Sequence, residues 1–494
     1  MQLKPKEVMP IVLIIGILVL TVFAQSTRAV SASSAVTDMM YIPREPIIIG
    51  ENASFSAYGF PGNGSLSDPY RIEGYDIYAM DGGHCISISL VSCHYIISDC
   101  ILHGSTDADT SAIYIYKNSY GIISGCEIYN CSIGIELSDN LFDEAYLVHD
   151  THISDFTYVG VLMQDAGNIE LENVSAIQDM AGLDADYGVR IQNSKNISFV
   201  ECRFTNHTGA WGAGIYSEES DAIEILGCSF YGASHIQLEH HNSNITVSGC
   251  TLVDSEIHIT GAGNSGRITV TDNTLKLYYT DWEWSRGILV GSNESEAFVA
   301  RNTIEGYATG IDTYDSSDTI AQNTLIHCSV DGIRVIGDRN VVTNNTLTHC
   351  GHGIGVSGSN NTVTTNMLLS NDIGIRLFQL FSDCSDNSLF YNRFVSNTVS
   401  ATDDGLSNTW DDSDGLGNYW DDFPPSQTGV YNVTGSAGSV DRWPIYVGEE
   451  MPPSSTTTTT SGTTGSLDTE VLILVTLAGV SIVIIAVAIV SKRR

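Results

Sequence analysis

One pattern recurs along the chain about every 22 residues, and this period constrains the fold more than any other feature. Three consecutive stretches show it: AFVARNTIEGYATGIDTYDSSD (297–318), TIAQNTLIHCSVDGIRVIGDRN (319–340) and VVTNNTLTHCGHGIGVSGSNN (341–361). Each reads Asn-Thr and an apolar residue, then a variable segment, then Gly-Ile-x-apolar and a polar turn. Self-similarity at such a period indicates units that stack on one another.

A marker position defines thirteen repeats at intervals of 21 to 29 residues. The marker is a small residue, and the residue two positions after it is apolar and expected to be buried. Two repeats are exceptions, because they have the polar residues His152 and Ser175 at that position. The marker residues are Cys100, Cys126, Asp150, Asn173, Cys202, Cys228, Cys250, Asn273, Asn302, Asn323, Asn345, Asn366 and Asn392. We expect the asparagines to form a hydrogen-bonded ladder inside the molecule, and five of the eleven cysteines to pack there as small apolar residues.

Each repeat holds two or three short runs of β-branched and aromatic residues between Gly, Asn, Ser and Asp turns. No amphipathic helix of ten residues fits between them. Because a single repeat cannot bury its own apolar row, the sequence predicts an all-β parallel solenoid of about 13 coils. A β-sandwich or propeller would need longer strands and hairpin turns.

Both ends of the chain carry membrane signals. Lys4 and Lys6 precede an apolar run and small residues, which is the order of a secretory signal over 1–35 or of an N-terminal anchor. The twenty uncharged residues 471–490 are long enough for a transmembrane helix, and the basic residues 491–494 favour a cytoplasmic tail. A Thr/Ser-rich stalk over 451–470 would join this helix to the ectodomain. We therefore expect a single-pass cell-surface protein.

The composition is strongly acidic, with 58 Asp and Glu against 21 Lys and Arg. A nucleic-acid partner is excluded, because phosphate binding requires clustered basic residues. Eleven Asn-x-Ser/Thr sequons fit a glycosylated exterior. We expect a monomer whose partners are extracellular glycans or envelope components.

Three stretches resemble a known family. The repeats look like those of the NosD-like and carbohydrate-binding/sugar-hydrolase β-helix families, which include many archaeal surface proteins. GNGSLSDPYRIEGYDI (62–77) resembles the segment before their first coil, and NTWDDSDGLGNYWDDF (408–423) resembles their C-terminal end. The resemblance implies a single-stranded right-handed parallel β-helix, here over 95–408, with an N-terminal cap segment over 36–94 and a C-terminal cap over 409–450.

The C-terminal stretch offers aromatic area to close the core and oxygen ligands for a cation. We expect Trp410, Tyr419, Trp420, Phe423 and Trp443 to cover the last coil. Calcium near three neighbouring carboxylates is one hypothesis, and the candidate ligands are Asp411, Asp412 and Asp414.

GHGIGVSGS (351–359) is similar to the Gly-His-Gly motif of polygalacturonase-type hydrolases, which are also right-handed β-helices. Inverting hydrolysis needs two carboxylates that flank the bond. Thr309 and Val330 stand where the family has carboxylates, and only Asp331 remains. We therefore expect His352 to be a repeat residue rather than a catalytic one, with Asp331 and His352 kept as candidate ligand-binding residues.

Two His-Cys pairs hold equivalent positions on adjacent repeats, which suggests a copper or zinc site. The candidate ligands are His327, Cys328, His349, Cys350 and His352. The resemblance to NosD implies copper handling as well. The alternatives are a buried thiol stack or a disulfide, because neighbouring residues in a strand face opposite ways.

The segment before the Gly-Ile strand varies most in length, and insertions at one point of a solenoid emerge on one face. Aromatic rings beside carboxylates suit sugars, so the candidate ligand-binding residues here are Trp211, Asp281, Trp282, Glu283 and Trp284. The favoured hypothesis is non-catalytic binding or display of extracellular carbohydrate in an adhesive or envelope role. The alternatives are an extracellular polysaccharide lyase or glycoside hydrolase and a copper-handling protein.

Overall fold

The computed structural model describes residues 41–446, 477–478 and 481–482, but within the first range not 80–82, 119, 141–144, 179–186, 208–211, 279–283, 292–295, 381–382, 413 and 425. The chain divides into two compact units, Met1–Gly448 and Glu449–Arg494. In the described part of the second unit, β47 (Leu477–Ala478) pairs with β48 (Ser481–Ile482). No helix among the described residues is long and apolar enough to span a membrane, and most of the expected span 471–490 lies outside them.

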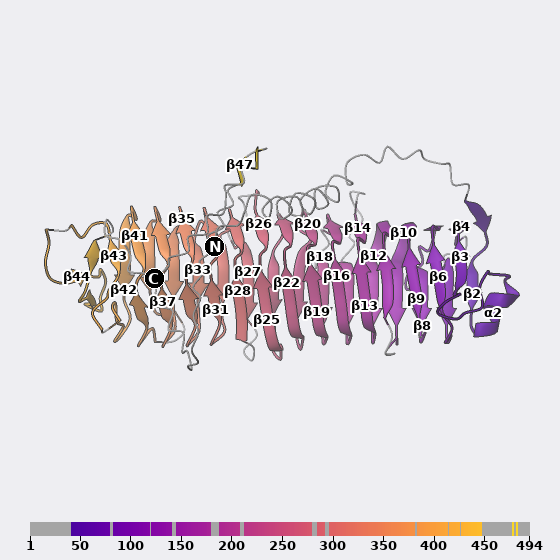
Figure 1. The fold of residues 1–494 in the computed structure, drawn as a ribbon, viewed down its shortest axis with the longest axis horizontal. Coiled ribbons are helices and arrows are strands. Elements are labelled where there is room, and N and C mark those ends of the chain that lie inside the picture. The colour runs from indigo at the N-terminus through magenta and orange to yellow at the C-terminus, as the bar shows by residue number, and fades with distance from the viewer. Residues whose placement is uncertain are drawn as a thin grey trace, which may run out of the picture. The chain divides into compact units, whose positions relative to one another are not determined.

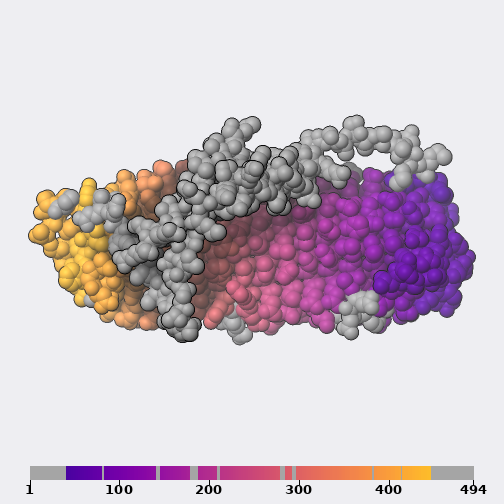
Figure 2. Space-filling model, viewed as in Figure 1, coloured from indigo at the N-terminus to yellow at the C-terminus, as the bar shows by residue number. Residues whose placement is uncertain are grey.

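The first unit is a right-handed parallel β-helix of about 14 turns, as the repeat and the resemblance predict. Each turn gives one strand to each of three parallel sheets, which run the length of the rod (Figure 1). The colour changes in bands across the long axis in Figure 2, so successive turns stack in chain order. The turns begin before Cys100, because the expected cap segment 36–94 already contains strands of all three sheets.

Sheet I contains β1 (Ile42–Arg44), β4 (Tyr75–Tyr78), β7 (Ile101–His103), β10 (Glu127–Ser138), β12 (His152–Gln164), β14 (Ser175–Ile177), β17 (Arg203–Thr205), β20 (Ser229–Tyr231), β23 (Thr251–Val253), β26 (Thr274–Lys276), β29 (Thr303–Glu305), β32 (Thr324–Ile326), β35 (Thr346–Thr348), β38 (Met367–Leu369), β41 (Arg393–Val395), β43 (Tyr419–Trp420) and β46 (Ile445–Tyr446). Sheet II contains β2 (Ile47–Ile49), β5 (Ile86–Ser89), β8 (Ser111–Tyr116), the second halves of β10 and β12, β15 (Tyr187–Gln192), β18 (Ala213–Glu218), β21 (His235–Glu239), β24 (Ile257–Thr260), β27 (Arg286–Gly291), β30 (Thr309–Thr313), β33 (Asp331–Val335), β36 (His352–Val356), β39 (Ile373–Leu377) and β42 (Val399–Asp403). Sheet III contains β3 (Tyr70–Glu73), β6 (Tyr95–Ser98), β9 (Gly121–Ser124), β11 (Tyr146–His149), β13 (Gly167–Glu172), β16 (Lys195–Val200), β19 (Asp221–Leu226), β22 (Ser243–Ser248), β25 (Ser265–Thr271), β28 (Glu296–Ala300), β31 (Thr319–Ala321), β34 (Val341–Thr343), β37 (Thr362–Thr364) and β40 (Ser388–Phe390). The short pair β44 (Tyr431–Asn432) and β45 (Val440–Asp441) is antiparallel.

The corners between sheets share one construction. A residue in the left-handed backbone conformation points outward, and the next residue points into the rod. At the corner from sheet III to sheet I, Gln322 has φ 58° and Asn344 has φ 57°, and each is followed by a buried asparagine. Asn, Asp and Gly tolerate this backbone best, which explains why the turns of the repeat are rich in them.

The inward residues of this corner form the predicted ladder. Asn323 is buried, its Nδ2 donates to Oδ1 of Asn345 at 3.0 Å and to the Val299 carbonyl at 2.9 Å, and its Oδ1 accepts from Asn302. Two of the predicted marker residues are wrong by one place. Asp150 and Asn173 are the outward left-handed residues, and the ladder position is filled by the next residues, Thr151 and Val174.

A second ladder, which the marker row does not contain, follows the corner from sheet II to sheet III. Asn340 donates from its backbone to Oδ1 of Asn361, which donates in the same way to Asn387, both at 2.8 Å. Asp318 lies in this row between Ala297 and Asn340, and its Oδ1 accepts the backbone N–H of Ala297 at 2.8 Å. Burial raises the pKa of Asp318 to about 6.

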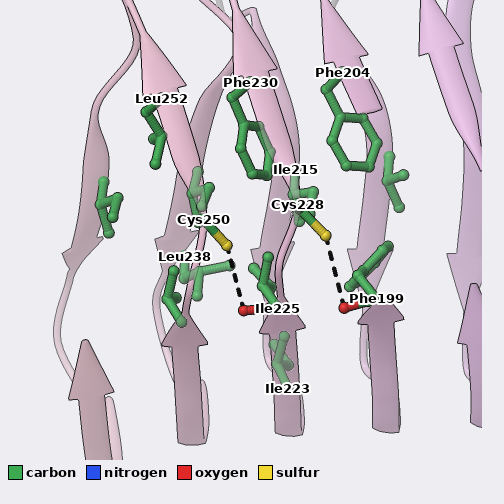
Figure 3. Close-up of a cluster of buried hydrophobic side chains, with 14 of the residues drawn as sticks. Phe199, Phe204, Ile215, Ile223, Ile225, Cys228, Phe230, Leu238, Cys250 and Leu252 are labelled. Atoms are coloured by element: carbon green, nitrogen blue, oxygen red, sulfur yellow. Dashed lines mark hydrogen bonds between the residues drawn. The ribbon is translucent and has the colours of Figure 1, made fainter. Parts of the chain in front are cut away.

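The interior is filled by columns of like side chains from the three sheets. Figure 3 shows Phe204, Phe230 and Leu252 of sheet I above the columns of sheets II and III. The cysteine column lies between them, where Cys228 Sγ donates to the Phe199 carbonyl at 3.7 Å and Cys250 Sγ to that of Ile225 at 3.5 Å. All eleven cysteines are free thiols, so the cysteines of this row pack rather than pair covalently.

Both ends of the β-helix are covered by aromatic residues. At the N-terminal end the short helix α2 (Asn52–Ala57) buries Phe55, whose ring stacks on Tyr70 at 4.8 Å. At the C-terminal end Trp410 and Trp420 are fully buried, and their indole N–H groups donate to Asp403 and Asp441, both at 2.9 Å.

Tyr419 and Phe423 are also buried at this end, whereas Trp443 is half exposed and does not close the core.

We predict that Asn323→Leu lowers the stability of the β-helix by about 1–3 kcal/mol, because Asn302 and the Val299 carbonyl lose their buried partner. Thr303→Leu, on the exposed side of the same sheet, is the control and should change stability by less than about 0.5 kcal/mol. Thermal unfolding of both variants measures the difference. Equal melting temperatures would place Asn323 outside the ladder.

We predict that Asp318→Asn stabilises the protein by about 1–3 kcal/mol at pH 7.5 and has little effect at pH 4. The folded-state pKa is about 6, above the ordinary 3.8, so the native carboxyl is favoured when protonated and its contribution is lost as pH rises through 6. Melting temperatures between pH 4 and 8 measure this, with the exposed Asp383→Asn as the control for charge. A pH-independent effect would contradict it.

Candidate functional site

A column of glycines runs along sheet II, and packing between turns requires them. A Cβ on Gly353 would lie 2.5 Å from the carbonyl oxygen of Gly374, and one on Gly332 would lie 2.7 Å from that of Gly353. Gly351 is equally confined, at 2.7 Å from the carbonyl oxygens of Ser329 and Val330. The glycines of the Gly-His-Gly stretch therefore have a structural explanation.

The side chains on either side of this column point outward and form two rows. The hydrogen-bonded register between neighbouring strands determines which residues belong to each row. We call them row a, one residue before the column glycine, and row b, two residues after it. Between β27 and β39, row a is Arg286, Thr309, Asp331, His352 and Ile373. Over the same strands, row b is Leu289, Asp312, Arg334, Gly355 and Arg376.

Three charged residues of these rows form one ion-paired group. Asp312 lies on the outer side of the sheet. It nevertheless has no exposed surface, because Arg286 and Arg334 cover it. Arg286 Nε donates to Asp312 Oδ2 at 2.8 Å, and Arg334 Nε donates to Oδ1 at 2.8 Å. Arg334 also donates to the Tyr314 hydroxyl at 3.2 Å. The Asp312 carboxylate raises the pKa of Arg334, so this cation is permanent.

Asp331 and His352, both predicted from the sequence as ligand-binding candidates, are brought together. Asp331 is buried, and its Oδ1 lies 2.9 Å from His352 Nδ1 on the next turn. Thr309 is their register neighbour on the other side, whereas Val330 points to solvent. Asp331 can orient the imidazole, but no second carboxylate stands beside the pair in row a.

Toward the N-terminus, row b continues with tyrosines and another arginine. It reads Tyr114, Glu136, Leu162, Arg190, Tyr216, Gln237 and His258 up to Leu289. Arg190 donates to Glu218 at 3.2 Å and to the Tyr158 hydroxyl at 2.6 Å, and the ring of Tyr187 lies 4.9 Å from that of Tyr216. Burial and the nearby Glu218 raise the pKa of Tyr216 to about 12, so its hydroxyl stays protonated.

Of the insertion residues expected on one face, Trp211, Asp281, Trp282 and Glu283 lie outside the described residues. Trp284 is described and is 80% exposed. It stands two residues before Arg286, at the corner that leads into sheet II. This corner therefore adjoins the charged group of sheet II.

Two of the three carboxylates of the calcium hypothesis are hydrogen-bonded to other groups of the protein. Asp411 is buried and accepts Arg442 Nε at 2.8 Å. Asp412 Oδ1 accepts the backbone N–H groups of Asp414 and Leu416, both at 2.9 Å. Asp411 thus serves an ion pair and Asp412 a turn.

Two shallow depressions of about 490 and 580 Å³ lie on the outer face of sheet III rather than on sheet II. Short side chains such as Ser198, Thr246 and Thr269 make the first one hollow, and it contains no aromatic ring. Sheet II carries the ordered charges and rings, so we place the candidate site there. Sequence reasoning missed Asp312, Arg334 and Arg376, although each is the variable residue of the Gly-Ile-x-apolar frame.

The three-sheet solenoid with its polar outer face defines a right-handed β-helix protein. The family model described as "Right handed beta helix region" matches residues 141–279, and the one described as "Periplasmic copper-binding protein (NosD)" matches residues 224–424. These two matches and the three-sheet solenoid support a NosD-like right-handed β-helix. No curated protein gives a significant sequence match.

Solved β-helix structures are similar at low identity. A periplasmic alginate epimerase, AlgG, is 13% identical over 64% of this chain and 76% of that chain, with a TM-score of 0.34. The A-module of a mannuronan C-5 epimerase from Azotobacter vinelandii is 15% identical over 74% and 87%, with a TM-score of 0.29. The catalytic unit of an alpha-1,3-glucanase from Streptomyces thermodiastaticus is 11% identical over 75% and 70%, with a TM-score of 0.35. Similarity at this level says nothing about the chemistry of this chain.

The residues predicted as copper or zinc ligands face two directions. His327 and His349 are left-handed corner residues that point to solvent, with ring centroids 5.3 Å apart. Cys328 and Cys350 follow them and point into the core. The hydrogen bond between the two thiols raises the pKa of Cys328 and lowers the pKa of Cys350. Within the described part of the chain, no three His, Cys, Asp or Glu side chains converge as metal ligands would. The histidines and the cysteines of the two pairs face opposite sides of the corner.

We predict that Asp312→Asn lowers stability by about 3–5 kcal/mol, because two guanidinium groups then face each other without their buried counter-charge. Asp272→Asn is the matched control, because the Arg301–Asp272 pair is about half exposed and should be worth at most about 1 kcal/mol. Denaturant unfolding compares them. Similar losses in both variants would mean that the sheet II group is an ordinary surface pair.

Proposed function

We propose that the protein is a non-catalytic, cell-surface β-helix that binds an extracellular glycan along the outer face of sheet II. The observation that carries this proposal is row b, where two tyrosines, three arginines and one glutamine lie in register between Tyr114 and Arg376, among acidic, apolar and other residues. Hydrogen bonds to neighbouring carboxylates hold two of these side chains in place: Arg190 donates to Glu218, and Arg334 donates to Asp312.

Such a row suits a linear polysaccharide that runs along the rod. Sugar rings stack their C–H faces on aromatic rings, and their hydroxyl groups hydrogen-bond to charged side chains. Successive turns present the row every ~4.8 Å, so a polymer meets equivalent positions repeatedly. Because salt bridges and ring contacts hold the side chains in place before binding, less conformational entropy is lost when the glycan binds.

The proposed cell-surface location rests on two apolar segments of the sequence. Residues 1–35 as a signal or anchor and 471–490 as a span would hold the β-helix outside the cell on the stalk 451–470. The acidic composition suits a soluble monomeric rod there, and the partners would be glycans or other envelope components.

Cleavage of a polysaccharide is the second candidate, and the hydrogen bond between Asp331 and His352 favours it. Hydrolysis needs another acid or base across the bond. Asp312 is committed to two arginines, and Thr309 fills the neighbouring place in row a. We therefore expect no reducing or unsaturated ends from polymers that bind, and release that disappears in His352→Ala would establish an enzyme instead.

We predict that Tyr216→Ala weakens polysaccharide binding by about tenfold, which corresponds to about 1.4 kcal/mol for a lost ring contact. Tyr231→Ala is the matched control, because Tyr231 lies on the same turn but on the outer side of sheet I. Titration of the full-length protein with a set of neutral and acidic polysaccharides measures both. Equal effects of the two variants, or no binding by the unaltered protein, would contradict the proposal.

A further inference from the structure

Asparagine has two structural roles at the corners of this β-helix, and the residues that follow it differ between them. The inward asparagines of the ladders, such as Asn323 and Asn345, are followed by an outward residue and then by a buried apolar one. The outward, left-handed asparagines are followed by an inward residue and then by an outward one. Because side chains alternate along a strand, only the left-handed asparagine shares the outer surface with the residue two places later.

Most of the left-handed asparagines begin an Asn-x-Ser/Thr sequon. Nine asparagines among the described residues have a positive φ, and seven of them begin a sequon. These seven are Asn130, Asn173, Asn196, Asn206, Asn244, Asn344 and Asn360. Left-handed aspartates suit the same backbone, yet only four of nine (Asp109, Asp155, Asp272 and Asp386) have Ser or Thr two places later. The corner therefore requires the left-handed residue but not the hydroxyl that follows it.

Five of the seven sequons lie on sheet III or at its ends, and we call them the sheet III sequons. Asn196 and Asn244 lie in β16 and β22, Asn360 precedes β37, and Asn173 and Asn344 follow β13 and β34. All five asparagine side chains are exposed. In each sequon the middle residue is buried and the Ser or Thr is half-buried on the outer side. The amide and the hydroxyl of each sequon therefore both face outward.

Two of these sequons border one hollow. The depression of about 490 Å³ on the outer face of sheet III is lined by Asn196, Ser198, Asn244 and Thr246. Serine and threonine side chains are short, so a sugar bonded to either amide has room above the sheet.

The amide groups of the sheet III sequons also keep hydrogen atoms available for reaction. Each side-chain amide donates at most one hydrogen bond within the described part of the chain. Asn244 Nδ2, for example, donates to Asp221 Oδ1 at 2.8 Å, and no described residue accepts a hydrogen bond from Asn360 Nδ2. Because an amide nitrogen carries two hydrogens, at least one remains on each.

One exposed asparagine outside sheet III has no accessible hydroxyl beside it. Asn130 begins the sequon Asn-Cys-Ser within β10, and its side chain is exposed. Ser132, however, is buried and only 5% exposed. The folded chain thus presents the amide of this sequon without its hydroxyl.

We propose that sheet III is the N-glycosylated face of the β-helix, with glycans bonded to the five asparagines of the sheet III sequons. In this modification Asn Nδ2 bonds to the anomeric carbon of a glycan carried on a lipid phosphate. The carbon–oxygen bond to the phosphate breaks, the phosphate leaves with its electron pair, and the amide loses one proton. A membrane glycosyltransferase that acts on the folded chain catalyses the transfer. This inference goes beyond the proposed glycan binding and shares with it only the location outside the cell.

The test is peptide mass mapping of the full-length protein purified from the cells that produce it naturally. We expect a glycan mass on each peptide that contains a sheet III sequon and none on the peptide that contains Asn130. Thr362→Ala, expressed in the same cells, should lose the glycan at Asn360 although the asparagine is retained. Thr362→Ser is the matched control and should keep it, and thermal unfolding shows that both variants are folded.

Protease added to intact cells separates this inference from the proposed function. If the protease degrades the β-helix but most sheet III peptides are unmodified, this inference fails while the glycan-binding proposal stands. A glycan on Asn130 as well, or one retained on Asn360 in Thr362→Ala, would also overturn it, because the folded structure would then not select the sites. If the protease cannot reach the protein, both proposals fail.

Discussion

Every turn of this β-helix depends on its corners, where a residue in the left-handed backbone conformation precedes a residue that points inward. Asn344 and Asn345 show the arrangement: the first has φ 57°, and the second bridges two turns with its amide. The left-handed residue turns the chain into the next sheet, and the amide satisfies backbone groups that the corner would otherwise leave buried without partners. Parallel strands cannot be joined by tight hairpins, so the stack of sheets exists only where these corners keep their register.

The same corner explains which parts of the structure the sequence predicts. Strand positions and the main ladder follow from the alternation of apolar residues and from the period, and they are where the repeat places them. The sequence pattern places Asp150 and Asn173 in the ladder, because Asn and Asp suit both the left-handed residue and its inward neighbour. Only the buried Thr151 and Val174 decide between the two places. His327 and Cys328 look like a ligand pair for a similar reason, and the corner turns them to opposite sides.

The charged group on sheet II could not be predicted in this way. Asp312, Arg334 and Arg376 occupy the variable place of the frame, where a charge ordinarily means a solvated surface. Their proximity depends on register between turns of different length, and Arg286 meets Asp312 only because row a and row b converge on it. The Gly-His-Gly motif points to His352 and to Asp331 on the preceding repeat, whereas no motif marks the arginines around them.

Stability alone does not account for those charges. Leu162 and Leu289 occupy row b on other turns, so an apolar residue satisfies the packing of this position. Burying Asp312 instead removes a carboxylate from water, and two arginines must be ordered to offset that cost. A row in which a buried carboxylate is held by two arginines departs from what the repeat requires of it. This departure is the structural basis of the glycan-binding proposal, because the residues on the other turns already satisfy the packing of the fold.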